Sequence, residues 1–191
     1  CGAIQCSYHG AICFSQPSVY PLAVARSIEP NRKILTMQIF DGVMPPLCEA
    51  LAKREYSTLT PVQESVLDPD LVNSDLIVSS QTGSGKTVAF GLAMAPTILG
   101  DKEIFELSGP PVALVIAPTR ELALQVKTEL SWLYKLTKAS IVSCVGGMDM
   151  RTEQRALRGN AHIVVGTPGR LKDHIERGSL KLQHIKGLVL D

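Results

Sequence analysis

The chain has 191 residues, of which 45% are hydrophobic, and this size and composition predict one folded domain with a hydrophobic core. The formal net charge of +1 excludes a general electrostatic attraction to nucleic acids or anionic membranes, so local groups must hold any such partner. The five cysteines form no C-x-x-C pair, which excludes a disulfide framework or zinc site of the usual pattern and fits a reducing cytoplasm.

Residues 1–36 show little helical or strand periodicity, and the chain does not begin with methionine. We expect this segment to be non-native or disordered, with Met37 or Met44 as the natural start. The sequence has no apolar run of about 18 residues, so we expect no membrane-spanning helix. It also lacks the basic and continuous apolar regions of a signal peptide, so we do not expect secretion.

From Pro46 onward, short apolar runs alternate with helix-like stretches. The predicted strands are 76–78, 113–116, 141–145, 163–165 and 188–190. The predicted helices are 47–52, 86–99, 119–137, 149–158 and 168–177. Strands that are apolar without alternation favour a parallel sheet covered on both faces. Their alternation with helices indicates βαβ units and an open α/β fold.

A cluster of Gly, Thr, Arg or Asp residues follows or closes each predicted strand. In chain order these clusters are "QTGSGKT", "PTREL", "VGGMD", "TPGR" and Asp191. If the strands are parallel, all five clusters lie at the carboxyl edge of the sheet. Open α/β sheets bind their ligands at this edge, so we expect the functional site there.

The segment "SSQTGSGKT" predicts a phosphate-binding loop. Gly83 and Gly85 allow backbone angles that let consecutive N–H groups surround a phosphate, and a helix beginning near Lys86 adds its positive end. Lys86 provides a cation for the β- and γ-phosphates, and Thr87 provides a hydroxyl for Mg²⁺. Ser80 replaces the first glycine of the general pattern, but that position ends the predicted strand. The alternative is an ordinary glycine-rich turn before a helix.

"PTREL" and "TPGR" share one design, in which a threonine can cap the helix that follows a strand. Arg120 and Arg170 then lie at helix starts, beside free N–H groups, where a sugar-phosphate backbone can bind. Alone, each is equally consistent with a capped helix and a solvated arginine, and Gly146-Gly147 is consistent with an ordinary turn. Their common edge favours a ligand site.

"SSQTGSGKT", "APTRELALQ", "VGG", "VVGTPGRL" and "LVLD", in this order, resemble the first RecA-like domain of a bacterial-type DEAD-box ATP-dependent RNA helicase. Upstream, "YSTLTPVQ" is similar to the adenine-reading Q motif of that family. The resemblance covers about 40–191. It implies a RecA-like P-loop fold, with an open, mainly parallel sheet and helices on both faces, and makes 37–191 an incomplete first helicase domain.

The resemblance also implies roles for individual residues. Gln63 reads the adenine edge, with Tyr56 and Phe40 beside the base. Lys86, Thr87 and Asp191 are the catalytic residues, and Thr87 and Asp191 hold Mg²⁺ partly through water. The residues that hold the ATP phosphates are Thr82, Gly83, Ser84, Gly85, Lys86 and Thr87. The residues that contact the backbone of an RNA strand, without reading its sequence, are Arg120, Gly147, Thr167 and Arg170.

The sequence departs from the family pattern at Glu55, Leu59 and Ser80, and Phe40 lies closer to Gln63 than the family's isolated aromatic residue does. Asp191 corresponds to the first residue of Asp-Glu-Ala-Asp. The intact protein is expected to be a cytoplasmic, monomeric ATPase, without membrane contact, that separates short RNA duplexes. The 191-residue chain lacks a second RecA-like domain with its arginine fingers, so we expect weak nucleotide binding and little hydrolysis.

Two other functions remain open at this point. One is a P-loop ATPase of another class, such as a DNA helicase or a transporter ATPase. The other is a non-enzymatic nucleotide- or RNA-binding module, or an incomplete fold that tends to aggregate. The histidines at 162, 174 and 184 show no ligand spacing and are expected to be surface or packing residues. Trp132 and Tyr134 are expected to be core or half-buried.

Overall fold

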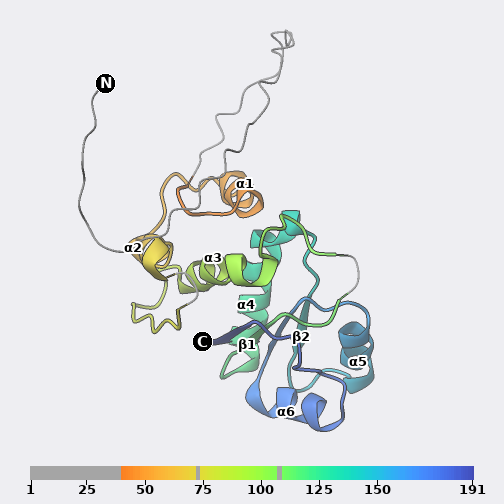
Figure 1. The fold of residues 1–191 in the computed structure, drawn as a ribbon. Coiled ribbons are helices and arrows are strands. Elements are labelled where there is room, and N and C mark those ends of the chain that lie inside the picture. Colours follow the sequence, from red (N-terminus) through yellow and green to blue (C-terminus); the bar gives the residue numbers. More distant parts are fainter. Residues whose placement is uncertain (1–39, 72–73, 107–108) are drawn as a thin grey trace, which may run out of the picture. The chain divides into compact units, whose positions relative to one another are not determined.

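Four short strands form one fully parallel sheet in the order β2–β3–β1–β4 (Figure 1). We describe this sheet in a computed structural model, which describes residues 40–71, 74–106 and 109–191. The strands are β1 (Ala113–Ile116), β2 (Ile141–Cys144), β3 (Ile163–Gly166) and β4 (Gly187–Leu190). Four of the five predicted strands are therefore confirmed. The segment expected to be non-native or disordered, 1–36, lies outside the described residues.

The helices agree closely with the periodicity of the sequence, and α3 has the predicted bounds. They are α1 (Pro45–Lys53), α2 (Pro61–Ser65), α3 (Lys86–Leu99), α4 (Arg120–Leu133), α5 (Met150–Arg158) and α6 (Pro168–Glu176). Short 3₁₀ turns occur at Pro69–Leu71 (η1) and Lys135–Thr137 (η2). The predicted helix 119–137 is thus α4 followed by a separate turn. None of the helices in the described ranges is long and apolar enough to cross a membrane.

Successive strand residues point to opposite faces of the sheet, and each face has its own core. On β1, Ala113 and Val115 belong to a cluster that includes residues of α1, α3 and α4. Leu114 belongs to a second cluster with Leu157 of α5 and Leu171 of α6. Helices therefore cover both faces (Figure 1), which confirms the fold expected from unbroken apolar strands.

The predicted strand 76–78 was wrong. Leu76, Ile77 and Val78 are exposed, Ile77 completely, and the segment belongs to no strand of the described sheet. β4 pairs with β1 on one side and with no other described strand on its second side. An apolar run becomes a strand only where a neighbouring strand accepts its backbone hydrogen bonds. Its sequence alone does not provide that neighbour.

A buried tyrosine connects the two long helices. The Tyr134 hydroxyl donates to the carbonyl of Gly91 in α3, at 2.6 Å, and burial raises the pKa of Tyr134 well above its ordinary value. A Cβ on Gly91 would lie only 2.7 Å from Leu133 Cδ2, so the glycine lets α3 and α4 approach closely. Since Tyr134 is fully buried and Trp132 is half-buried, both match the sequence prediction.

Candidate functional site

The predicted phosphate loop is closed around its own lysine. Lys86 Nζ donates to the carbonyl oxygens of Ser80 and Gln81, at 2.6 and 2.8 Å. Gly83 and Gly85 have φ angles of 80° and 88°, and Gly85 is the N-cap of α3. Ser80 ends no strand, so that expectation was wrong; its hydroxyl lies 2.8 Å from that of Ser84, within the loop. The loop therefore holds a cation at a helix N-terminus, which suits a phosphate.

Gln63 and Thr60 fasten the start of α2 to this loop. The Gln63 Nε2 donates to the Gly85 carbonyl at 3.3 Å, and the Thr60 hydroxyl donates to the Ser84 carbonyl at 2.9 Å. Gln63 Oε1 accepts from the Thr60 N–H at 3.0 Å. Gln63 is 1% exposed, and both polar atoms already have protein partners. Its adenine-reading role stays a prediction.

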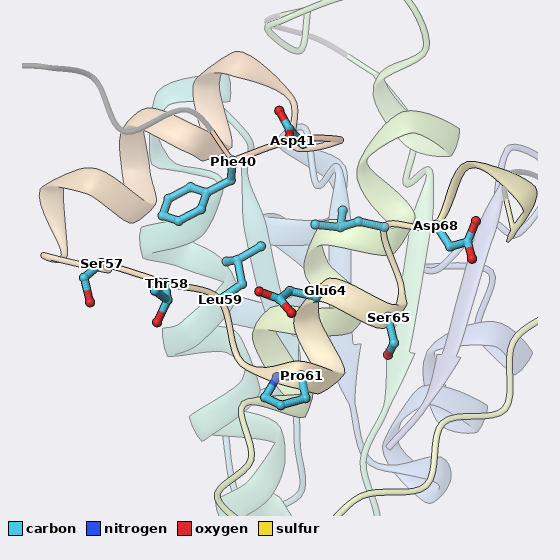
Figure 2. A pocket seen from close by; sticks show the side chains of 10 residues that line it. Phe40, Asp41, Ser57, Thr58, Leu59, Pro61, Glu64, Ser65 and Asp68 are labelled. Atoms are coloured by element: carbon cyan, nitrogen blue, oxygen red, sulfur yellow. The ribbon is translucent and has the colours of Figure 1, made fainter.

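An open hollow of about 810 Å³ lies beside α2. Figure 2 shows Phe40, Thr58 and Leu59 among its walls, together with the carboxylates of Glu64 and Asp68. Phe40 therefore lines an open space beside α2, and its place beside the adenine stays a prediction. Neither Tyr56 nor Gln63 is among the residues that line this hollow.

Tyr56 instead lies against an aromatic and charged cluster on α4. Its ring centroid is 6.0 Å from that of Trp132, and the Arg54 guanidinium lies 5.0 Å from the same indole. Trp132 Nε1 donates to Glu129 Oε2 at 2.7 Å, which fixes the indole. Burial, aided by the nearby Glu129 carboxylate, raises the pKa of Tyr56. Tyr56 is thus neutral and half-buried, and its place beside a base stays a prediction.

Three of the four predicted RNA-contacting residues, which follow β1, β2 and β3, come together at one exposed turn. Arg120 Nη1 donates to the Gly146 carbonyl at 2.9 Å, and Arg170 Nη2 donates to the Met148 carbonyl. Gly147 has a φ of 80°, and a Cβ there would lie 2.4 Å from Arg120 Nη1. The glycine therefore leaves room for the arginine to cross the turn.

Thr119 and Thr167 differ, although the sequence predicts a cap for both. Thr119 accepts from the Leu122 N–H at 3.3 Å and caps α4. Thr167 occupies the N-cap position of α6, but its side chain accepts no capping hydrogen bond, so this part of the prediction was wrong. Pro168 at the first helical position has no backbone N–H, so α6 has one fewer free donor that needs a cap. The proline ring also fixes the backbone angle of the first turn. The Thr167 backbone N–H instead donates to the Cys144 carbonyl at 3.1 Å.

The sequence analysis missed Glu153, which is buried behind this edge. Its Oε1 accepts from the Val145 N–H at 2.9 Å. Its Oε2 accepts from Arg170 Nε at 2.7 Å and from His174 Nε2 at 2.8 Å. Glu153 is 3% exposed and His174 is completely buried, so His174 is a packing residue, as expected. This carboxylate therefore joins α5, α6 and the end of β2.

Two groups of side chains are candidates for a metal ion. Ligand atoms of Cys144, Glu153 and His174 lie within 4.8 Å of one another. However, burial and the Glu153 carboxylate raise the pKa of Cys144 to about 12, and both Glu153 oxygens already accept from protein donors. This group is a structural network, because a metal needs the thiolate and free carboxylate oxygens.

Thr87 and Asp191 offer the oxygen ligands that Mg²⁺ prefers. Thr87 is the second residue of α3 and lies beside the phosphate loop. Asp191 is exposed, and its N–H donates to the Ile116 carbonyl at 2.9 Å, which extends the pairing of β4 with β1. Asp191 thereby lies at the same sheet edge as the clusters after β1, β2 and β3.

Comparison with known proteins gives one consistent family. A family model described as "DEAD/DEAH box helicase" matches residues 60–191. The DEAD-box ATP-dependent RNA helicase CshA of Geobacillus kaustophilus is 37% identical over 150 residues, which are 78% of this chain and 31% of the relative. The ATP-dependent RNA helicase CshA of Listeria monocytogenes is 42% identical over 150 residues, which are 78% of this chain and 28% of that relative. The chain thus spans less than a third of these relatives.

Solved structures agree with this result. The structure titled "S. cerevisiae Dbp5 bound to RNA and ADP BeF3" superimposes with a TM-score of 0.66 and 32% sequence identity. The match covers 78% of this chain and 36% of that one. The similarity therefore extends to the fold as well as to the sequence.

Proposed function

Because this chain belongs to the DEAD/DEAH box helicase family, we propose that 37–191 is the ATP- and RNA-binding part of an ATP-dependent RNA helicase. Its fold is the RecA-like parallel sheet covered by helices on both faces. The complete protein would separate short RNA duplexes at the expense of ATP hydrolysis. A second RecA-like domain, a monomeric state and a cytoplasmic location are parts of the same proposal.

The phosphate loop is the observation that carries the proposal. Lys86 lies at the N-terminus of a 14-residue helix, inside a loop whose carbonyls bind its ammonium group. The positive φ angles of the two glycines let the backbone curve tightly before α3, where the phosphates of ATP would bind. Thr82 and Ser84 complete this curve, and Lys86 would exchange carbonyl partners for phosphate oxygens.

Thr87 and Asp191 would hold Mg²⁺, partly through water. When bound, the ion neutralises charge on the β- and γ-phosphate oxygens. The residues themselves fit this task because both supply hard oxygen ligands, Thr87 at the start of α3 and Asp191 at the carboxyl end of β4. The low turnover expected of the 191-residue chain alone stays a prediction.

The base and the RNA would bind on either side of the phosphate loop. Gln63, fixed to Gly85, would meet the adenine edge, with Tyr56 and Phe40 beside the base. Arg120, Gly147, Thr167 and Arg170 would contact the sugar-phosphate backbone of one strand, since both arginines bind the exposed turn that contains Gly147. Backbone contacts do not distinguish bases, so binding would be sequence-tolerant.

The direct test is nucleotide binding by the wild-type chain and by Lys86→Ala. We expect Mg-ADP to raise the thermal midpoint of the wild type, because a ligand stabilises the state that binds it. Without the lysine, affinity should fall at least about tenfold, since charge-assisted hydrogen bonds are lost. Lys172→Ala is the control, because it removes an exposed lysine of α6 outside the loop. Equal affinity of Lys86→Ala and wild type would contradict the phosphate site.

The same measurement with Mg-GDP tests the base-reading part. Preference for the adenine nucleotide is expected if Gln63 reads the base. Equal binding of guanine and adenine nucleotides would favour a P-loop ATPase of another class.

A further inference from the structure

Glu153 is a buried carboxylate whose hydrogen bonds join three parts of the fold. It lies in the first turn of α5, a short helix that carries three exposed arginines, yet its own side chain is buried. Its partners come from the end of β2 and from α6, which are distant in sequence. A buried charge is retained only where it is paired and fully hydrogen-bonded, and Glu153 meets this condition through three donors.

Arg170 is the one donor of the three that reaches the surface. Its side chain is 14% exposed, against 3% for Glu153 and none for His174. Nε bonds to the carboxylate, and Nη2 bonds to the carbonyl of Met148. Within the described part of the chain, Nη1 has no hydrogen-bond partner. Two fixed nitrogens leave the guanidinium little freedom to rotate, so the position of Nη1 is set by Glu153.

The same carboxylate also fixes the turn that Arg170 touches. Val145, whose N–H donates to Glu153 Oε1, directly precedes the exposed turn Gly146–Met148. That turn accepts from Arg120 at Gly146 and from Arg170 at Met148. Thus one buried residue orients both the turn and an arginine that holds it.

We infer that Glu153 is a positioning residue for RNA binding, which sets Arg170 and the turn Gly146–Met148 for contact with a strand's phosphates while His174 holds the carboxylate from the interior. This inference rests on the proposed RNA-binding function. It assigns Glu153 no contact with RNA. Through electrostatics alone, the negative charge beside Arg170 would weaken RNA binding, whereas positioning of Arg170 would strengthen it. Because the two effects have opposite signs, removal of the charge distinguishes them.

The experiment compares Glu153→Gln with wild type in binding a fluorescent single-stranded oligouridylate, over a series of salt concentrations. We expect affinity to fall roughly threefold to tenfold, the contribution of one typical hydrogen bond. The slope of log affinity against log salt should decrease by about 0.7, the value for one phosphate contact on a single strand. An unchanged or higher affinity would overturn the inference, because it would mean that Glu153 only masks Arg170.

Three comparisons separate positioning from general damage. Glu176→Gln removes a carboxylate from the exposed end of α6 and should leave RNA affinity unchanged. Glu153→Gln should cost nothing further in an Arg170→Ala background, since coupled residues are not additive. Affinity for Mg-ADP should be the same in Glu153→Gln and wild type. Full additivity with Arg170→Ala would overturn the inference.

Arg170→Lys keeps the test valid if Glu153→Gln does not fold. Lysine retains the charge but cannot bond Glu153 and Met148 together, so positioning predicts weaker RNA binding and a retained affinity would overturn it. The Arg170 Nε proton, followed by NMR without RNA, should exchange slowly with solvent in wild type. In Glu153→Gln the exchange should become fast. An unchanged signal would overturn the inference. If wild type bound no RNA but this signal behaved as expected, the proposed function would fail, and Glu153 would position Arg170 only within the fold.

Discussion

At the scale of single residues, His162 is held in one neutral form. Its Nδ1 accepts from the Ser140 N–H at 2.9 Å, so Nε2 carries the proton and donates to the Glu106 carbonyl, also at 2.9 Å. The ring stacks on Phe105 with centroids 4.7 Å apart. Burial lowers the pKa of His162 below its ordinary value of 6.5, and the bond to Glu106 opposes this effect only in part. A second proton would break the bond to Ser140.

This arrangement predicts a loss of stability in mild acid. The unfolded chain takes up the histidine proton near pH 6.5, while the folded chain takes it up only at a lower pH. The neutral His162 therefore contributes fully to the free energy of unfolding above about pH 6.5, the unfolded-state pKa. This contribution is lost as the pH falls through the lower pKa of the folded state. Urea unfolding, followed by the fluorescence of Trp132, should show a shallower decline towards acid pH in His162→Gln than in wild type. The exposed His184→Gln should decline as wild type does, and equal slopes in all three would contradict the prediction.

At the scale of elements, α4 and α6 begin alike in sequence but not in structure. Both follow a strand and a threonine, but only Thr119 accepts a capping hydrogen bond from its helix. We therefore expect Thr119→Ala to lower the free energy of unfolding by about 0.5 to 1 kcal/mol, since its bond is long for a cap. Thr167→Ala is the matched control and should change stability much less, as measured by urea unfolding. Equal losses would show that Thr167 also caps its helix.

The elements also show what sequence patterns can and cannot predict. The bounds of α3 followed from the glycines before Lys86 and from the apolar stretch after it, which are local signals. The strand at 76–78 did not form, because pairing depends on a neighbour outside the run itself. Glu153 lies on a mostly polar helix, and its side-chain partners are 17 and 21 residues away, so no local period indicated its burial.

At the scale of the whole described fold, the edge strand β4 exposes apolar side chains. Leu188 and Leu190 of β4 are 59% and 76% exposed, and the apolar segment 76–78 is exposed as well. Unpaired backbone groups beside apolar side chains favour association with other chains, so we expect light scattering to rise with protein concentration. Leu188→Lys should reduce this association, because a charge on an edge strand opposes pairing. Leu182→Lys, at an exposed leucine outside the strands, should not; an equal effect would exclude the edge as the cause.

The closed phosphate loop has a consequence for the rate at which a nucleotide binds. Without a ligand, the Lys86 ammonium group is already solvated by two carbonyl oxygens, and the Ser80 and Ser84 hydroxyls already face each other. A phosphate cannot simply enter; it has to take the lysine from these oxygens. If a nucleotide binds at this loop as proposed, binding would contain a step in which the loop rearranges, and the rate of that step would not depend on ligand concentration. The observed rate of nucleotide binding should therefore level off at high nucleotide concentration, because rearrangement of the loop, and no longer diffusion, then limits the rate.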